Sequence, residues 1–194
     1  MIDLQDPNQL LLLTVDLFTK AKIPYAMYGG LALAVYGIPR ETGDVDCVLL
    51  ASSVEATKQL LTSALQNSIV PIDAMDFGAI VLTRVTVLPG ELQKKSYMGL
   101  NMVDLIVPKD QAYSQRILAR AVTGPFLGRE VTVVAPEDFV LLKCLSAREQ
   151  DLFDVQKVLE VLGDRMDLDL IQNEINNLAV EYPELVERWE KIRI

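Results

Sequence analysis

The chain has 194 residues, which is enough for one domain or for one domain with a helical addition. It contains no histidine, so catalysis by a serine or cysteine with a histidine base is excluded, as is zinc bound by histidine. The net charge of −9 makes the chain a poor non-specific binder of nucleic acid. Residues 149–194, with 12 acidic and 5 basic side chains, carry most of the negative excess.

Apolar side chains make up 51 % of the sequence, ample for a buried core. No uninterrupted apolar run reaches the roughly 18 residues of a membrane span, and the N-terminus lacks the basic region of a signal peptide. Cys47 and Cys144 lie in apolar segments, which indicates buried thiols in a reducing compartment. We therefore expect a cytoplasmic protein that does not cross a membrane and has one apolar surface for an oligomer or partner.

The N-terminal residues 5–22 are predicted to form an amphipathic helix. Apolar side chains recur there at helical spacing, Asp6 is a suitable N-cap, and Pro7 suits the first turn. Residues 25–28 read as a short strand. Gly29-Gly30 interrupts that strand and opens a short helix over 31–36.

A second strand is predicted over residues 44–50. Its alternation places Asp44 and Asp46 on one face, about 7 Å apart by the rise of a strand. Two carboxylates so placed repel unless a positive charge lies between them. Mg²⁺ prefers one or two carboxylates together with substrate phosphates. The pair therefore predicts a magnesium site.

The Gly29-Gly30 turn predicts a phosphate site beside these carboxylates. Glycine leaves no side chain between backbone and ligand, and N–H groups at the start of a helix favour phosphate. Arg40 and Thr42 lie in the loop that leads to the Asp44–Asp46 strand. Phosphate cradle and metal ligands thus occur close together in the chain.

The next segments predict a helix to about residue 66, a β-rich stretch over 79–88 and a loop over 91–99. Lys94-Lys95 in that loop is interpreted as exposed rather than as a phosphate contact. A strand follows over 100–107, and Asp104 is the lone acid in it. A desolvated carboxylate is costly, so we expect a metal or a substrate hydroxyl as the partner of Asp104.

The remainder predicts a helix over 110–122, a hairpin over 125–134 and a set of closing helices. Lys109, Arg116 and Arg120 lie near one face of the first of these helices, and we interpret that face as solvated. The closing helices are predicted from residue 135 through 146 and over 152–162, 168–178 and 183–193.

The stretch from Gly29 to Asp46 reads Gly-Gly-Leu-Ala…Tyr-Gly…Arg-x-Thr-x-Asp-x-Asp. It resembles the core of the nucleotidyltransferase (polymerase beta-like) superfamily, and most closely the branch that contains AbiEii-type toxins. That superfamily has a Gly-Gly or Gly-Ser turn, an Asp-x-Asp pair and a third Asp on a later strand, which is the place of Asp104. Residues 136–155, with a Lys followed by Arg-x-x-Asp-x-x-Asp, are a second point of resemblance to this branch.

The resemblance implies an α/β (α+β) fold in which helices flank a small mixed sheet. The nucleotidyltransferase-like core would span residues 1–134, and a helical C-terminal part, residues 135–194, would complete the pocket. It also implies site roles. The catalytic and metal-binding residues would be Asp44, Asp46 and Asp104. The nucleotide-binding residues would be Gly29, Gly30, Arg40, Thr42, Lys143, Arg148, Asp151 and Asp154.

Some of these roles have alternatives. A lysine on an otherwise apolar helix, such as Lys143, either extends its stem to solvent or is paired, and beside a triphosphate we expect phosphate as the partner. Arg148, Asp151 and Asp154 would line the same pocket or form an ion-pair network within the protein.

The implied function is Mg²⁺-dependent transfer of a nucleoside monophosphate from an NTP to an acceptor hydroxyl by two-metal chemistry. The acceptor would be RNA for the toxin of a toxin–antitoxin pair, with an antitoxin protein or a homo-oligomer as partner. Two alternatives differ in class. One is a small-molecule transferase of the antibiotic-modifying type, and the other is a non-catalytic binding or regulatory module. The acidic charge of the chain disfavours RNA as the acceptor.

Overall fold

The computed structural model describes residues 3–4, 6–65, 73–87, 101–146 and 148–193. In this part of the chain seven strands form one mixed sheet in the order β3-β4-β5-β2-β1-β7-β6. The strands are β1 (Tyr25–Tyr28), β2 (Asp44–Leu49), β3 (Asp73–Phe77), β4 (Ile80–Val87), β5 (Asn101–Pro108), β6 (Val122–Phe126) and β7 (Arg129–Val133). The helices are α1 (Pro7–Ala21), α2 (Gly29–Val35), α3 (Val54–Leu65), α4 (Gln111–Arg120), α5 (Pro136–Ser146), α6 (Glu149–Leu162), α7 (Leu168–Leu178) and α8 (Glu184–Ile192), with short 3-10 turns at Ala51–Ser53 and Gly163–Arg165.

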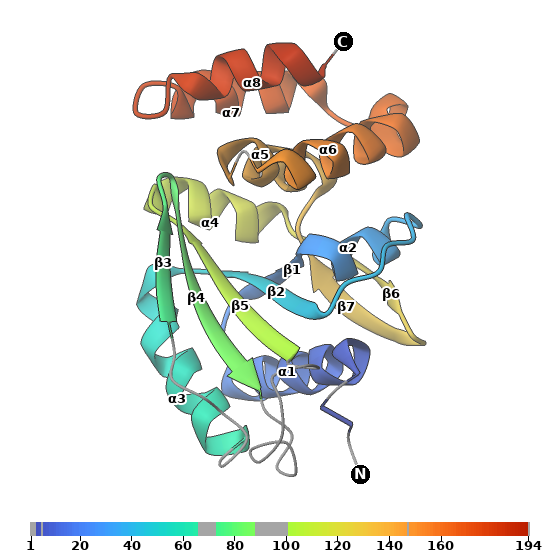
Figure 1. Ribbon diagram of the computed structural model, residues 1–194, viewed down its shortest axis with the longest axis vertical. Helices are drawn as coiled ribbons and strands as arrows, with labels where there is room; N and C mark the ends of the chain where they lie inside the picture. Colours follow the sequence, from blue (N-terminus) through green and yellow to red (C-terminus); the bar gives the residue numbers. More distant parts are fainter. Residues whose placement is uncertain (1–2, 5, 66–72, 88–100, 147, 194) are drawn as a thin grey trace.

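Helices cover both sides of the sheet. α1 and α3 pack against each other and against β2 and β4, while α4 and α5 lie on the opposite side (Figure 1). α6 follows α5, and α7 and α8 form the layer farthest from the sheet. The predicted α/β fold, a mixed sheet flanked by helices with a helical C-terminal part, is confirmed.

The first helix forms for the reasons that the sequence suggests. The Asp6 carboxylate accepts a hydrogen bond from the N–H of Asn8 at 2.9 Å, and Pro7 opens the helix. Its apolar stripe is buried, with Leu10, Leu11 and Phe18 fully enclosed. α2 begins at Gly29 itself, two residues earlier than predicted.

Two strand predictions differ from the structure. β3 was not predicted because its sequence, Asp-Ala-Met-Asp-Phe, shows little alternation of apolar and polar residues. It lies at the edge of the sheet and is held there by its pairing with β4. β6 begins three residues before the predicted hairpin. Leu127 and Gly128, both at positive φ, form the two-residue turn that joins β6 to β7. The loop prediction for residues 91–99, with Lys94-Lys95, lies outside the described residues.

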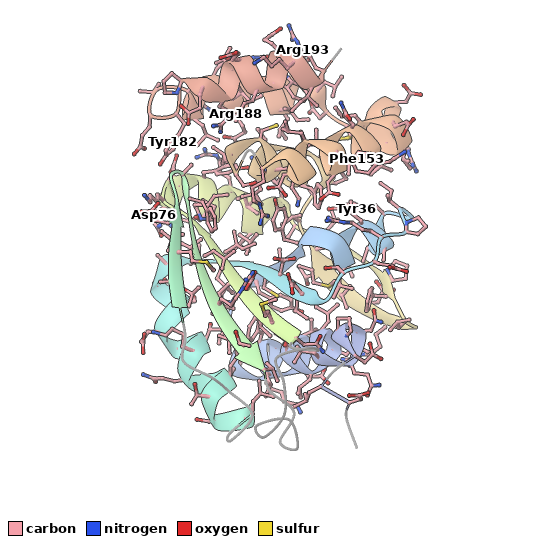
Figure 2. All side chains as sticks on the ribbon, in the orientation of Figure 1. Tyr36, Asp76, Phe153, Tyr182, Arg188 and Arg193 are labelled. Carbon is pink, nitrogen blue, oxygen red and sulfur yellow. The ribbon has the colours of Figure 1, made fainter. Side chains whose placement is uncertain are left out.

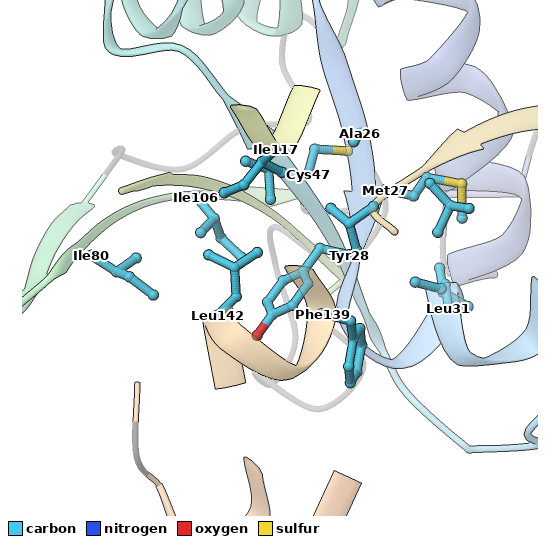
Figure 3. Close-up of a cluster of buried hydrophobic side chains, with 14 of the residues drawn as sticks. Ala26, Met27, Tyr28, Leu31, Cys47, Ile80, Ile106, Ile117, Phe139 and Leu142 are labelled. Atoms are coloured by element: carbon cyan, nitrogen blue, oxygen red, sulfur yellow. The ribbon is translucent and has the colours of Figure 1, made fainter. Parts of the chain in front are cut away.

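The core extends from the sheet onto α5. Figure 3 shows Phe139 and Leu142 of α5 beside Tyr28 of β1 and Ile106 of β5, and all four side chains are buried. The Tyr28 and Phe139 rings have their centroids 5.2 Å apart. Since Tyr28 and Ile106 belong to one face of the sheet, α5 is the helix that covers this face.

The basic residues after β5 do not form the solvated face that we predicted. Arg120 donates to both carboxylate oxygens of Asp138, at 2.6 and 2.9 Å, and to Glu174 at 2.7 Å. Arg116 makes two further bonds to Glu174, both at 2.8 Å. Lys109 pairs at the surface with Asp76 at 2.9 Å. The prediction was wrong because the partners of these arginines lie on α5 and α7, far along the chain.

The last helix is also tied to α5 through the backbone. Arg188 donates to the carbonyl oxygen of Cys144 at 3.1 Å, near the end of α5 (Figure 2). Cys144 and Cys47 are both buried and free. Within the described ranges, no helix combines the length and the apolarity needed to cross a bilayer.

We expect Arg120→Met to lower the free energy of unfolding by about 3–5 kcal/mol, because it leaves the fully buried Asp138 carboxylate without its cation. The matched control is Lys191→Met, which removes an exposed pair with Glu187 and should change stability by less than about 1 kcal/mol. Urea unfolding of both variants measures the difference. Equal losses would mean that the α4–α5–α7 pairs do not stabilise the docking of these helices.

Candidate active site

A row of four side chains crosses the centre of the sheet. Strand register pairs Tyr28 of β1 with Asp46 of β2, Asp46 with Asp104 of β5, and Asp104 with Arg84 of β4. Directly paired residues on neighbouring strands point to the same face, and Asp44 shares that face by alternation. The three acids that the sequence singles out therefore lie on one face.

This face opens into a cavity of about 280 Å³. All the predicted site residues line it except Asp154, which forms ion pairs with two of the lining residues, Lys143 and Arg40. Their functional roles stay predictions. The lining consists of Tyr28, Gly29, Gly30, Arg40, Glu41, Thr42, Gly43, Asp44, Asp46, Leu82, Arg84, Asp104, Ile106, Lys143, Arg148 and Asp151.

A larger cavity, of about 670 Å³, lies among the C-terminal helices and is lined by residues such as Phe153 and Trp189. It contains none of the predicted site residues. Cavity size therefore does not identify the site. The site is identified by the acids and cations that converge on the smaller cavity from β2, β4, β5, α5 and the start of α6.

The two glycines make room for neighbouring side chains. A Cβ on Gly29 would lie 1.9 Å from Oδ2 of Asp46, and a Cβ on Gly30 would lie 2.7 Å from Cβ of Thr42. Gly29 also has a φ of +70°, a conformation that glycine adopts without strain. Besides any contact with phosphate, this turn lets the Asp46 carboxylate lie directly against the backbone.

No cation of the described residues contacts Asp44 or Asp46, although the charges of Arg84, Lys143 and Arg148 act on them from a distance. Neither carboxylate accepts a hydrogen bond or forms an ion pair within the described part of the chain. Burial, followed by the negative charge of Asp104, raises the pKa of Asp46 to about 7. The same two causes raise the pKa of Asp44. Two carboxylates without partners are thus held in unfavourable surroundings.

These two side chains fit a hard divalent cation. They offer only oxygen atoms, which Mg²⁺ prefers, and a cation would relieve both desolvation and repulsion. No group of three or more carboxylate or thiol side chains among the described residues is arranged to hold a metal ion jointly. The residues that fit Mg²⁺ best are therefore Asp44 and Asp46.

Asp104 has a partner within the protein that the sequence analysis did not name. Arg84 donates to both its oxygens, from Nε at 2.9 Å and from NH2 at 2.6 Å, and the predicted metal or substrate hydroxyl stays a prediction. The Asp104 side chain is 3 % exposed and that of Arg84 is 30 % exposed. Sequence reasoning missed Arg84, although it too is a lone charge in a β-rich apolar run and needs a partner for the same reason.

Lys143 is neutralised inside the protein. Its Nζ lies 2.6 Å from Asp151 and 2.9 Å from Asp154, and 5.4 Å from the centroid of the Tyr28 ring. Arg40 pairs with Asp154, and Arg148 with Asp151 at 2.8 Å. The structure therefore contains the internal ion-pair network that was the alternative for Arg148, Asp151 and Asp154, and Lys143 and Arg40 belong to it as well.

We expect Gly29→Ala and Gly37→Ala to differ although both glycines have positive φ. Each change should cost about 1–2 kcal/mol of stability for the left-handed conformation. Gly29→Ala should lose about 1–3 kcal/mol more, because its Cβ displaces Asp46, whereas nothing lies within 4 Å of a Cβ on Gly37. Denaturant unfolding tests this difference. Equal losses would exclude the close contact with Asp46.

We also expect the stability advantage of Asp46→Asn over the parent to grow as pH rises from about 4 to 7. The folded pKa of Asp46 is about 7, against an ordinary value of 3.8. In this window the folded parent holds a proton that the unfolded chain has released, so its stability falls as pH rises. Unfolding at pH 5 and pH 8 without divalent cations measures this, with the exposed Asp169→Asn as control. Parallel pH profiles for the parent and Asp46→Asn would contradict the raised pKa.

Solved structures of low sequence identity share this fold. The crystal structure of JHP933 from Helicobacter pylori matches with a TM-score of 0.54 and 17 % identity, covering 96 % of this chain and 78 % of that one. The structure of ANT(2″)-Ia in complex with adenylyl-2″-tobramycin matches with a TM-score of 0.55 and 14 % identity, covering 94 % and 98 %. At such identities the likeness establishes the fold.

Sequence comparison is more specific. No curated protein matches the chain. A family profile does match residues 24–193, which is most of the chain, and it is described as "Nucleotidyl transferase of unknown function (DUF2204)". The resemblance to the nucleotidyltransferase superfamily is confirmed, while the AbiEii-type branch is not singled out. The chain belongs to this family of nucleotidyl transferases of unknown function.

Proposed function

We propose that the protein transfers a nucleoside monophosphate from an NTP to an acceptor hydroxyl, with Mg²⁺ held by Asp44 and Asp46. One observation carries the proposal. These two carboxylates have no partner among the described residues, and they face a cavity of about 280 Å³ in a nucleotidyltransferase fold. A site that keeps two such groups without a cation is suited to receive one with its substrate.

The chemistry that Mg²⁺ supplies in such a site is Lewis-acid stabilisation of the charge on the transferred phosphoryl group. The chain's own residues would bind and orient the triphosphate. Arg148, with a side chain 59 % exposed, is the most accessible cation of the lining and the one best placed to meet phosphate. Thr42 would position Asp44, because its Oγ1 accepts the N–H of Asp44 at 3.3 Å.

The helical segment after residue 134 takes part in this site. Lys143 of α5, and Arg148 and Asp151 at the start of α6, line the same cavity as the strand carboxylates. We propose that residues 135–194 complete the nucleotide pocket of a core formed by residues 1–134. Lys143 would act mainly by holding Asp151 and Asp154, since its amine is already shared between them.

A small-molecule acceptor fits the charge of the chain better than RNA does. The net charge of −9, concentrated after residue 148, repels a polyanion. The ANT(2″)-Ia complex contains an adenylylated small molecule, tobramycin. We therefore propose a small-molecule hydroxyl as acceptor. Transfer to RNA would instead support the toxin of a toxin–antitoxin pair.

A nucleotide-binding module without transfer activity is the second candidate. It is favoured by the ion pairs of Asp104 with Arg84 and of Lys143 with Asp151 and Asp154, which leave these charges less free to act on a substrate. Binding without transfer separates it from the enzyme.

The deciding experiment incubates the protein with each α-labelled NTP, Mg²⁺ and separate pools of RNA and small hydroxyl compounds. We expect label to pass to a small molecule with release of pyrophosphate. Asp44→Asn with Asp46→Asn should lower the rate at least about 100-fold, since several kcal/mol of transition-state stabilisation is lost. The matched control, Asp169→Asn on the exposed side of α7, should keep the parent rate.

Three results would change the conclusion. If calorimetry shows that NTP binds but no label passes to either pool, the transferase is refuted and the nucleotide-binding module is supported. Equal rates for the parent and the double variant would remove Asp44 and Asp46 from the mechanism. The absence of both binding and transfer would refute both functions.

A further inference from the structure

We propose that Arg84 is a built-in counter-cation that takes the place of a second metal ion. It holds Asp104 as a salt-bridged carboxylate, and it leaves Asp44 and Asp46 to bind a single divalent cation. The inference rests on the proposed function for its catalytic meaning. Its central claim, the number of ions bound, can be tested without nucleotide.

Arg84 and Asp104 form a bidentate salt bridge that fixes the orientation of the Asp104 carboxylate. The guanidinium meets both carboxylate oxygens, at 2.9 and 2.6 Å, in the two-pronged arrangement that arginine and carboxylate favour. The two residues are directly opposite on β4 and β5, in the centre of a continuous ladder. The carboxylate is nearly enclosed, so solvent offers it no substitute for the arginine.

Arg84 also belongs to the cavity, which distinguishes this pair from a purely structural ion pair. Its side chain is 30 % exposed and lines the cavity together with Leu82, its neighbour on the same face of β4. The pKa of Arg84 is raised first by its hydrogen bonds to Asp104, and the charges of Asp44 and Asp46 act in the same direction. The guanidinium therefore lies within electrostatic reach of all three acids.

The charges on this face balance with one divalent ion. Asp44, Asp46 and Asp104 together carry three negative charges when ionised, and Arg84 offsets one of them. The further cations that act on these acids are Lys143 and Arg148. Both are paired with Asp151, and Lys143 also with Asp154. One divalent ion thus neutralises the remaining two charges. A second ion at Asp104 would be repelled by the adjacent guanidinium.

The same arrangement assigns a role to Asp104. Held by Arg84, its carboxylate keeps one orientation beside Asp46. Arg84 is then a positioning residue for the third carboxylate of the site, which remains available to orient an acceptor hydroxyl.

The test is the number of Mn²⁺ ions bound per 194-residue chain in the absence of NTP. The electron paramagnetic resonance signal of free Mn²⁺ measures it. We expect one ion for the parent. Arg84→Met frees Asp104, and we expect it to bind two ions or to bind one at least tenfold more tightly. Arg84→Lys, which retains the positive charge, should bind one ion as the parent does. Two ions bound by the parent, or unchanged binding in Arg84→Met, would overturn the proposal.

A second variant covers the case in which Arg84→Met does not fold. Arg84→Met combined with Asp104→Asn leaves no unpaired charge, and circular dichroism checks its fold. We expect it to bind one Mn²⁺ within about threefold of the parent affinity, because Asp104 is not a ligand. Loss of the ion, or a tenfold weaker affinity, would show that Asp104 binds the metal.

The outcomes are separable from those for the proposed function. One bound Mn²⁺ without nucleotide transfer would refute the transferase and keep the role of Arg84. Two bound ions with transfer would keep the transferase and refute the role of Arg84. No Mn²⁺ bound by the folded parent would refute both the counter-cation and the Asp44–Asp46 metal site.

Discussion

Repulsion between carboxylates on the covered face of the sheet is the constraint on which the rest of the site depends. Asp46 and Asp104 are direct neighbours on parallel strands, in a place where water cannot fully screen their charges. The row that contains them has a cation near each end, Arg84 at one and Lys143 above Tyr28 at the other. Because α5 supplies Lys143 and β4 supplies Arg84, the charge of the row is tolerable only once distant parts of the chain have assembled.

The helical C-terminal part therefore has an electrostatic role as well as a packing role. Lys143 of α5 keeps its position through Asp151 and Asp154 of α6, while Phe139 and Leu142 of α5 cover the face (Figure 3). The docking of α5 in turn depends on buried ion pairs that join it to α4 and α7, with Asp138 fully enclosed. Helix docking and site electrostatics are thus coupled through a small number of charged contacts.

Sequence reasoning reached the parts of this arrangement that depend on local geometry. Alternation along one strand placed Asp44 and Asp46 on one face, and a Gly-Gly turn marked the start of α2. The sequence alone could not predict contacts that depend on which strands pair and in which register. Arg84 meets Asp104 only because β4 pairs antiparallel with β5 in one register, and a shift by one residue would send Arg84 to the opposite face. β3 was missed for a related reason, since its own residues hardly alternate.

Two acids on neighbouring strands, Asp104 and Asp46, differ in whether the protein supplies them with a cation. Asp104 lies in a strand where a charge is costly, and the protein supplies it with an arginine that satisfies both oxygens. Asp46, one strand away, receives no hydrogen bond within the described residues, and glycine at position 29 lets its carboxylate lie against the backbone. The acids left without an internal cation, Asp44 and Asp46, are therefore the ones at which a cation from solution is expected to bind.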